Sequence, residues 1–261
     1  DKAQTTRNRI ICVYTDDEKQ IVFMDTPGVH KPKHKLGEFM VDAAIESLKE
    51  TEAVLFVVAG NEKRGPGDNF IIEQLKRVKV PVFLVVNKID TLQKEQVLEA
   101  IVSYQDAYPF AGVIPISAKN KENLSELLTV LGEHLPEGPQ YFPEDMITDQ
   151  PERLIISDIV REKILLSTRD EIPHAIAVDV DEMKTRDDGT TYIRATIYCE
   201  RDSQKGIIIG NKGALLRKIG AEARMDIQKL LATKVYLDLW VKVKKDWRNK
   251  SGMLSELGYK K

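Results

Sequence analysis

Two clusters of polar residues in the first half of the chain directly follow apolar runs. D-T-P-G (residues 25–28) ends the run 21–24, and N-K-I-D (residues 87–90) ends the run 80–86. A carboxylate at the end of a buried strand can hold a phosphate-bound metal ion, and a backbone N–H of the following Pro-Gly turn can contact the phosphate. The D-x-x-G pattern is too short to be specific alone, so its interpretation depends on the clusters downstream.

The N-K-I-D cluster has the chemistry to recognise a guanine base. Guanine presents N1–H and its 2-amino group as adjacent donors, and the carboxylate of Asp90 can accept both in a bidentate pair. Adenine lacks the 2-amino donor, which would leave a carboxylate oxygen unpaired at a cost of about 1–3 kcal/mol. The methylene stem of Lys88 can lie along the base, and Asn87 can connect neighbouring loops. By itself, the cluster could equally be an Asn-Lys turn followed by a solvated aspartate.

A third cluster, S-A-K (residues 117–119), follows the apolar stretch 112–116 and can bring a backbone N–H to the O6 edge of guanine. The three clusters, in this order, resemble the G3, G4 and G5 motifs of translation-factor-class (TRAFAC) GTPases. The resemblance implies GTP or GDP as ligand, together with Mg²⁺. The nucleotide-binding residues that it implies are Asp25, Thr26, Pro27, Gly28, Val29, Asn87, Lys88, Asp90, Ser117, Ala118 and Lys119.

The same resemblance implies two magnesium-binding residues. In that class a threonine of the first switch binds the ion, and in Q-T-T-R (residues 4–7) the best match is Thr6, with Thr5 as the second choice. Without the resemblance, both threonines could be a polar lead-in to a strand. Asp25 would hold the ion through a water molecule, and the Gly28 N–H would sense the γ-phosphate.

Two departures from the GTPase pattern affect catalysis. No G-x-x-x-x-G-K-[ST] phosphate loop occurs among the 261 residues, so the chain as given is expected to bind nucleotide poorly and to be inactive, whereas the intact protein is expected to hydrolyse GTP. Val29 stands where Ras-like enzymes carry a water-orienting glutamine, so no catalytic residue is assigned. Slow hydrolysis is expected, or activation by potassium, a partner or RNA.

The second half of the chain contains a glycine-flanked loop, G-N-K-G (residues 210–213), between two apolar helical stretches. Glycines allow close approach to a sugar-phosphate chain, and the N–H groups that open the next helix suit phosphate. With the isoleucine run 207–209 before it, the loop resembles the GXXG loop of KH domains, which binds about four nucleotides; alone, it could be a helix–turn–helix. The predicted RNA-binding residues are Ile209, Gly210, Asn211, Lys212, Gly213, Arg217, Lys218 and Arg224.

The elements of the first half explain how three clusters can meet. Strands at 10–14 and 20–25 read as an antiparallel hairpin, and continuous apolar strands at 53–59, 80–86 and 112–116 alternate with helices at 36–49, 69–77, 94–107 and 124–134. This pattern predicts an α/β fold of the Ras-like P-loop GTPase type, truncated at its N-terminal end. A mostly parallel sheet is covered by helices on both faces, and the hairpin forms one antiparallel edge. Ligands of such sheets bind beyond the carboxyl ends of the strands, where all three clusters lie.

The second half follows a different pattern. Four prolines mark residues 136–151 as a linker, and the order α-β-β-α-α-β after it resembles a type II KH domain, an α+β fold. Its last helix is expected at 246–257. The predicted division is a GTPase domain at 1–135, the linker, and a KH domain with a C-terminal helix at 152–261. Lys242, Lys244 and Lys245, with Trp247, either extend the basic surface or lie on a solvated edge.

Composition narrows the class of protein. The net charge is −2, so the overall charge does not indicate a nucleic-acid partner, and an RNA-binding surface must be inferred from local basic patches. No DNA partner is expected. Cys12 and Cys199 lack a CxxC spacing, which indicates a reducing compartment and no disulfide or zinc framework. No apolar run approaches the roughly 18 residues of a membrane span. We expect a cytoplasmic protein, with peripheral contact to the inner face of the cell membrane as an additional association.

The order of a GTPase and a type II KH domain resembles the Era family of bacterial GTPases. The resemblance covers nearly the whole chain through Q-T-T-R, the three clusters, F-P-E-D-M-I-T-D (142–149), I-V-R-E-K-I (159–164), I-G-N-K-G-A-L-L-R-K-I-G (209–220) and L-D-L-W-V-K-V-K-K-D-W (237–247). It implies a role in 30S subunit assembly, binding to the single-stranded 3′ end of 16S rRNA on the 30S subunit with its proteins, and an RNA-binding state favoured by GTP. The alternatives are a passive KH module whose G domain is a scaffold, and a signalling GTPase whose KH-like domain binds protein.

Overall fold

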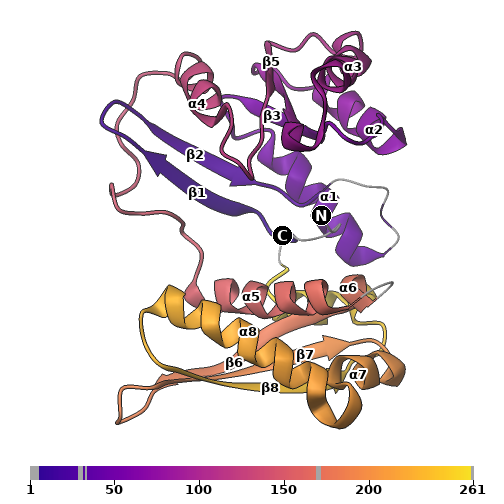
Figure 1. The fold of residues 1–261 in the computed structure, drawn as a ribbon, viewed down its shortest axis with the longest axis vertical. Helices are drawn as coiled ribbons and strands as arrows, with labels where there is room; N and C mark the ends of the chain where they lie inside the picture. Colours follow the sequence, from indigo (N-terminus) through magenta and orange to yellow (C-terminus); the bar gives the residue numbers. More distant parts are fainter. Residues whose placement is uncertain (1–5, 29–31, 33, 169–171, 260–261) are drawn as a thin grey trace. The chain divides into compact units, whose positions relative to one another are not determined.

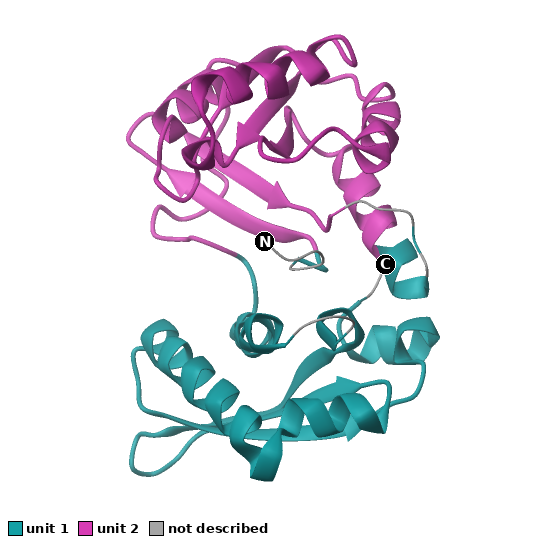
Figure 2. Cartoon of the chain, turned by 45° about the vertical axis from the view of Figure 1, so that its right-hand side comes forward, with its two compact units in different colours: residues 1–8, 32–39, 149–261 teal, residues 9–31, 40–148 magenta. Residues whose placement is uncertain are grey.

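The computed structural model describes residues 6–28, 32, 34–168 and 172–259 of the 261. The chain forms two compact units that do not follow chain order (Figure 2). Unit 1 comprises residues 1–8, 32–39 and 149–261, and unit 2 comprises residues 9–31 and 40–148. Two short N-terminal segments therefore belong to the same unit as the C-terminal part of the chain.

Unit 2 is built around three parallel strands. β4 (Val82–Asn87) lies between β3 (Val54–Ala59) and β5 (Gly112–Pro115), as the apolar runs predict. The first five residues of β4 are buried because side chains cover both faces of the sheet. One face packs on helices α2 (Pro66–Leu75) and α3 (Lys94–Gln105), and the other packs on α4 (Leu124–Gly132). Helix α2 begins three residues before the predicted start because Pro66 opens it and Asp68 accepts a 2.7 Å hydrogen bond from the Gly65 N–H.

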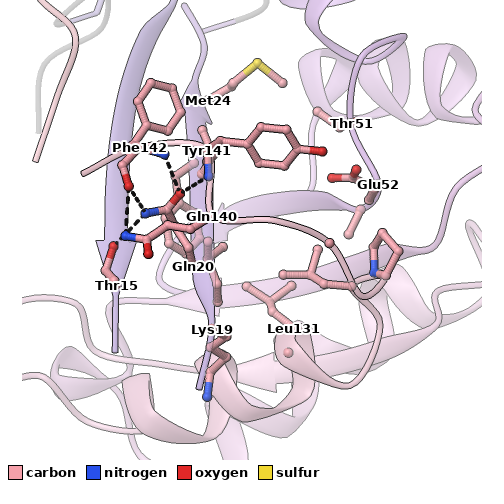
Figure 3. Close-up of a pocket in the computed structure, with 18 of the residues that line it drawn as sticks. Thr15, Lys19, Gln20, Met24, Thr51, Glu52, Leu131, Gln140, Tyr141 and Phe142 are labelled. Carbon is pink, nitrogen blue, oxygen red and sulfur yellow. Dashed lines mark hydrogen bonds between the residues drawn. The ribbon is translucent and has the colours of Figure 1, made fainter. Parts of the chain in front are cut away.

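The hairpin of β1 (Ile10–Thr15) and β2 (Gln20–Asp25) forms a sheet of its own (Figure 1). The expectation that it is an edge of the parallel sheet is therefore wrong. A cavity of about 1310 Å³, lined by β2 and by Ala53, Val54 and Leu55 at the start of β3, lies between the two sheets (Figure 3). Strands pair only when their backbones approach within about 5 Å, and among the described residues no strand lies between β2 and β3 to pair with both.

The proline-rich segment after α4 is fixed to the hairpin as far as Thr148. The side chain of Gln20 donates to the carbonyl of Phe142 at 2.9 Å and accepts from the N–H groups of Tyr141 and Phe142 at 3.0 and 2.9 Å (Figure 3). Further along, the Thr148 hydroxyl donates to the Ile11 carbonyl at 2.6 Å. Part of the predicted linker is thus an ordered strap on unit 2. The domain boundaries at 135–136 and 151–152 remain a prediction.

Unit 1 contains a three-stranded sheet in the order β6-β7-β8, with β6 and β7 antiparallel and β7 and β8 parallel (Figure 1). Its core consists of side chains from the sheet, α5 and α8. The elements are α5 (Glu152–Ser167), α6 (Ile172–Ala175), β6 (Ala177–Thr185), β7 (Thr191–Cys199), α7 (Asp202–Ile209), α8 (Ala214–Leu231), β8 (Val235–Val243) and α9 (Ser251–Glu256). The predicted order is confirmed, with the short α6 added.

The predicted C-terminal helix is divided into two parts. The 3₁₀ turn Trp247–Asn249 is separated from α9 by Lys250, whose extended backbone (φ −98°, ψ 106°) interrupts the helical path. Helix α1 (Lys35–Ser47) begins in unit 1 and continues in unit 2. In the described part of the chain, no helix combines the length and the apolar character that crossing a membrane requires.

The core of unit 1 can be tested with two isoleucines. Ile197 on β7 is fully buried, whereas Ile207 on α7 is 52% exposed. Ile197→Ala is expected to lower the free energy of unfolding by about 2–5 kcal/mol because it leaves a cavity. Ile207→Ala is the matched control and is expected to change it by less than about 0.5 kcal/mol, as at other surface sites. Urea unfolding followed by circular dichroism measures both, and equal losses would contradict this packing.

Candidate functional site

The ends of β4 and β5 are joined by the side chain of Asn87. Its Oδ1 accepts hydrogen bonds from the N–H of Lys88 at 2.7 Å and from the N–H of Ala118 at 3.1 Å. Parallel pairing brings the two strand ends to one edge, and the Ile116 N–H continues the ladder to the Val86 carbonyl at 2.8 Å. The structure therefore brings together two clusters that lie about thirty residues apart in the sequence, as their positions after adjacent strands predict.

Asp90 and Ser117 also meet in this cluster. The Ser117 hydroxyl donates to Asp90 Oδ1 at 2.7 Å and accepts from the Asn120 N–H at 3.1 Å. Ser117 is fully buried, while Asp90 is exposed in the 3₁₀ turn Ile89–Thr91. The hydroxyl therefore orients the carboxylate, whose two oxygens have lone pairs for further donors. Lys88 lies between Asn87 and this turn with φ +70°, a left-handed conformation that turns the chain sharply at the strand end.

The phosphate-side residues are only partly described. Asp25 is the last residue of β2 and is exposed, and Thr26, Pro27 and Gly28 follow it outside regular secondary structure in unit 2. Thr6 belongs to unit 1, so Thr6 and Asp25 do not share a unit. Val29 and Thr5 lie outside the described residues. No group of three or more His, Cys, Asp and Glu side chains suited to a metal ion occurs within the described ranges.

These residues fit part of a magnesium–nucleotide site. The cluster of Asn87, Asp90 and Ser117 supplies acceptors and N–H groups for a base, and Asp25 is an oxygen ligand of the kind Mg²⁺ prefers. Mg²⁺ is usually held by only one or two carboxylates plus the phosphates themselves. No phosphate-loop motif occurs among the 261 residues. The residues present therefore fit the binding of the base and the metal ion, but they do not include the loop that would surround the phosphates.

The G-N-K-G loop between α7 and α8 depends on its glycines. Gly210 has φ +72°, and a Cβ there would lie 2.8 Å from the Cβ of Leu215, which only glycine avoids. Gly213 has φ +78°, and Lys212 is exposed with φ +48°. These angles turn the chain within one 3₁₀ turn, Asn211–Gly213, so that α8 begins directly after the loop.

The other predicted RNA-binding residues surround this loop to different degrees. Arg217 closes it by donating to the Lys212 carbonyl at 3.0 Å, so part of its role is structural. Lys218 and Arg224 are exposed on α8, and the ammonium group of Lys218 lies 3.9 Å from Glu222. Ile209 is partly buried against the core of unit 1, which places it beside the loop as an apolar wall.

Comparisons with known proteins match both halves of the chain. The family model described as "Elongation factor Tu GTP binding domain" matches residues 2–137, and the one described as "KH domain" matches residues 171–248. A crystal structure of Aquifex aeolicus Era, a point-substituted form bound to GDP·AlF4⁻, is 41% identical to this chain. The match covers 99% of this chain and 88% of that chain, with a TM-score of 0.94. The chain belongs to the Era family.

A second Era structure, a complex with MgGDPNP and nucleotides 1506–1542 of 16S ribosomal RNA, is also 41% identical. The match covers 99% of this chain and 88% of that chain, with a TM-score of 0.95. The predicted family is therefore confirmed, as is the fold class of a Ras-like GTPase domain followed by a KH domain. Era proteins are GTPases, so the GTPase class is confirmed with the family.

Two residues near the predicted Era sites have roles that motif reasoning missed. Ser117 was expected to position a backbone N–H, and its hydroxyl also orients Asp90. Arg7 was noted only as the end of Q-T-T-R, and it is 2% exposed within unit 1. A buried arginine in a polar stretch leaves no signal in hydrophobic periodicity, so only the structure could reveal it.

The connection made by Asn87 can be tested without a ligand. Asn87→Ala removes the acceptor shared by Lys88 and Ala118, and the lost contact is expected to cost about 1–3 kcal/mol locally. The amide of Ala118 should then exchange with solvent about ten- to a hundredfold faster. Asn69→Ala, which removes an exposed acceptor of Arg64 on α2, is the control and should leave Ala118 unchanged. Exchange at Ala118 that is unaltered in Asn87→Ala would contradict the connection.

Proposed function

We propose that the intact protein is a GTP-binding and GTP-hydrolysing RNA-binding protein of 30S ribosomal subunit assembly, whose KH loop binds the single-stranded 3′ end of 16S rRNA. The observation that carries the proposal is the presence, in one chain, of the Asn87–Asp90–Ser117 cluster and the G-N-K-G loop. The support from relatives is the Era structure with both MgGDPNP and 16S rRNA nucleotides.

On the nucleotide side, each residue has a proposed task. Asp90, held by Ser117, accepts N1–H and the 2-amino group of guanine, and the Ala118 N–H contacts O6. The stem of Lys88 covers the base, and Lys119 closes the same loop. Thr26, Pro27, Gly28 and Val29 form the γ-phosphate segment. Asp25 and Thr6 hold Mg²⁺, which when bound neutralises charge on the phosphates. Val29 has no group to orient water, so no catalytic side chain is assigned.

On the RNA side, the backbone around Gly210 and Gly213 lets the sugar-phosphate chain approach, and exposed Lys212 adds charge. Asn211 at the loop tip, with Arg217, Lys218 and Arg224 on α8, flanks the same path, and Ile209 borders the bases. The single-stranded 16S rRNA end and the 30S subunit with its proteins are the proposed partners. DNA is not. We propose the cytoplasm as the location, and peripheral contact with the inner face of the cell membrane as an additional association.

Guanine recognition is tested by Asp90→Asn in the full-length gene product. Asparagine offers one acceptor and one donor, so it fits guanine poorly and suits xanthine, which carries an oxygen in place of the 2-amino group. The affinity of Asp90→Asn for GDP is expected to fall about tenfold to a hundredfold, and its affinity for xanthosine diphosphate (XDP) is expected to rise. Asp106→Asn, at the exposed end of α3, is the control. Isothermal titration measures both ligands, and unchanged GDP affinity in Asp90→Asn would refute guanine recognition by Asp90.

The KH assignment is tested by binding of a single-stranded RNA with the sequence of the 16S 3′ end. Lys212→Ala is expected to weaken binding and to reduce the slope of log affinity against log salt by about 1, because one phosphate contact is lost. Gly213→Asp should weaken binding more, because it adds negative charge and a side chain at φ +78°. Lys229→Ala, at the far end of α8 and 80% exposed, is the control. If Lys212→Ala and Gly213→Asp leave affinity intact, RNA is not bound at this loop.

A further inference from the structure

The side chain that follows the predicted magnesium threonine is buried in unit 1. Arg7 donates from Nη1 to the Ile176 carbonyl at 2.6 Å and from Nη2 to the His174 carbonyl at 3.3 Å. Its guanidinium lies 5.8 Å from the ring centre of Trp247, which is itself fully buried and donates to the Ala175 carbonyl at 3.0 Å. Arg7 thus fixes the chain next to Thr6 against the residues that link α6 to β6.

The energetics of this contact favour a releasable anchor over a permanent one. Arg7 is 2% exposed, yet within the described residues it makes no ion pair with a carboxylate, and its Nε has no hydrogen-bond partner. Burial of a charge without a paired counter-ion is costly, and the two carbonyls, the ring face of Trp247 and the neighbouring Tyr259 side chain offset part of that cost. Such a contact can be released at a smaller cost than a buried salt bridge would demand.

A second segment binds the same region of unit 1. We call residues 246–259 the Trp247 stretch. The Lys35 N–H donates to Asn249 Oδ1 at 3.2 Å, and the Lys35 ammonium donates to the Ser251 hydroxyl at 3.3 Å. The ring of Phe39 meets that of Tyr259 edge-on at 5.9 Å, and Tyr259 stacks on Trp247 at 6.4 Å. The segment next to Thr6 and the segment that follows Gly28 therefore both contact the Trp247 stretch.

A chain of polar contacts leads from this region to the RNA loop. Arg248 donates to the His174 carbonyl at 3.5 Å, the same atom that Arg7 contacts, and its Nη2 pairs with Glu200 at 2.5 Å. The N–H groups of Glu200 and Arg201 donate to Gln204 on α7 at 2.9 and 3.1 Å. Helix α7 ends at Ile209, directly before Gly210.

We propose that Arg7 is a positioning residue that links the magnesium threonine Thr6 to the RNA-binding loop through the Trp247 stretch and Glu200. This inference rests on the proposed function, because it requires that Thr6 responds to the nucleotide and that the G-N-K-G loop of unit 1 binds RNA. If Thr6 binds the metal in one nucleotide state and not in the other, the backbone of Arg7, its direct neighbour, shifts with it and disturbs the bonds of Arg7 to its carbonyl partners. The loop and α7 then respond to the nucleotide.

The experiment measures RNA affinity of the full-length gene product with GDP and with a non-hydrolysable GTP analogue. The ratio of the two affinities is expected to be about fivefold or more in the wild type, an ordinary size for coupling between sites. Arg7→Met is expected to bring this ratio to about one while RNA binding itself persists. The control is Arg9→Met, which removes an exposed ion pair with Glu50 and should preserve the ratio.

Trp247 supplies a spectroscopic readout that a purely structural role of Arg7 would not predict. These 261 residues contain two tryptophans, and Trp240→Phe removes the exposed one, so that Trp247 is the remaining emitter among them. Its emission should differ between the two nucleotides because the cation near its ring moves. Arg7→Met should abolish this difference and Arg9→Met should keep it. If Arg7→Met does not fold, Arg7→Lys tests the same point, since an ammonium group cannot bridge both carbonyls and should reduce the ratio partway.

A double-mutant cycle tests the route through Glu200. If Arg7 and Glu200 act in one network, Glu200→Gln should reduce the ratio and add little to Arg7→Met. The proposal is overturned if the ratio of RNA affinities in the two nucleotide states is unchanged in Arg7→Met. It is also overturned if the effects of Arg7→Met and Glu200→Gln on this ratio simply add, or if Trp247 emission is the same with both nucleotides. The proposed function fails separately, through unchanged GDP affinity in Asp90→Asn or unchanged RNA affinity in Lys212→Ala.

Discussion

The parallel pairing of β4 between β3 and β5 is the constraint on which the nucleotide side depends. It places the residues that follow two strands at one edge, so a single side chain, Asn87, can accept from the N–H of Lys88 and from the N–H of Ala118. The strand can hold this position because its first five residues are buried between helices on both faces. The proposed base-recognition residues thus lie on short loops that a packed sheet holds in position.

The RNA side has a comparable steric requirement. The turn from α7 to α8 is so tight that a Cβ at Gly210 would lie 2.8 Å from Leu215, and two further residues of the loop have positive φ. This geometry exposes the loop backbone and Lys212 while the flanking isoleucines pack into the core of unit 1. Both proposed sites therefore place exposed polar groups on buried apolar supports.

The division into units connects these two sites. Thr6 and residues 32–39 belong to unit 1, where Arg7 and Lys35 contact the Trp247 stretch, whereas the other proposed nucleotide-binding residues belong to unit 2. The covalent chain thus passes from one unit to the other close to the proposed nucleotide-binding residues. Arg7 has no carboxylate partner in the described part of the chain, which suits the releasable contact that we propose.

The sequence by itself determined the fold class and the residues at the strand ends, because buried parallel strands read as continuous apolar runs and the motifs follow them directly. It also identified the G-N-K-G loop, since glycines at that spacing have a conformational cause. Only the tertiary structure showed that the hairpin forms its own sheet, that Ser117 orients Asp90, and that Arg7 is buried beside Trp247. These features depend on contacts between residues far apart in the chain, and such contacts leave no local period or spacing from which to predict them.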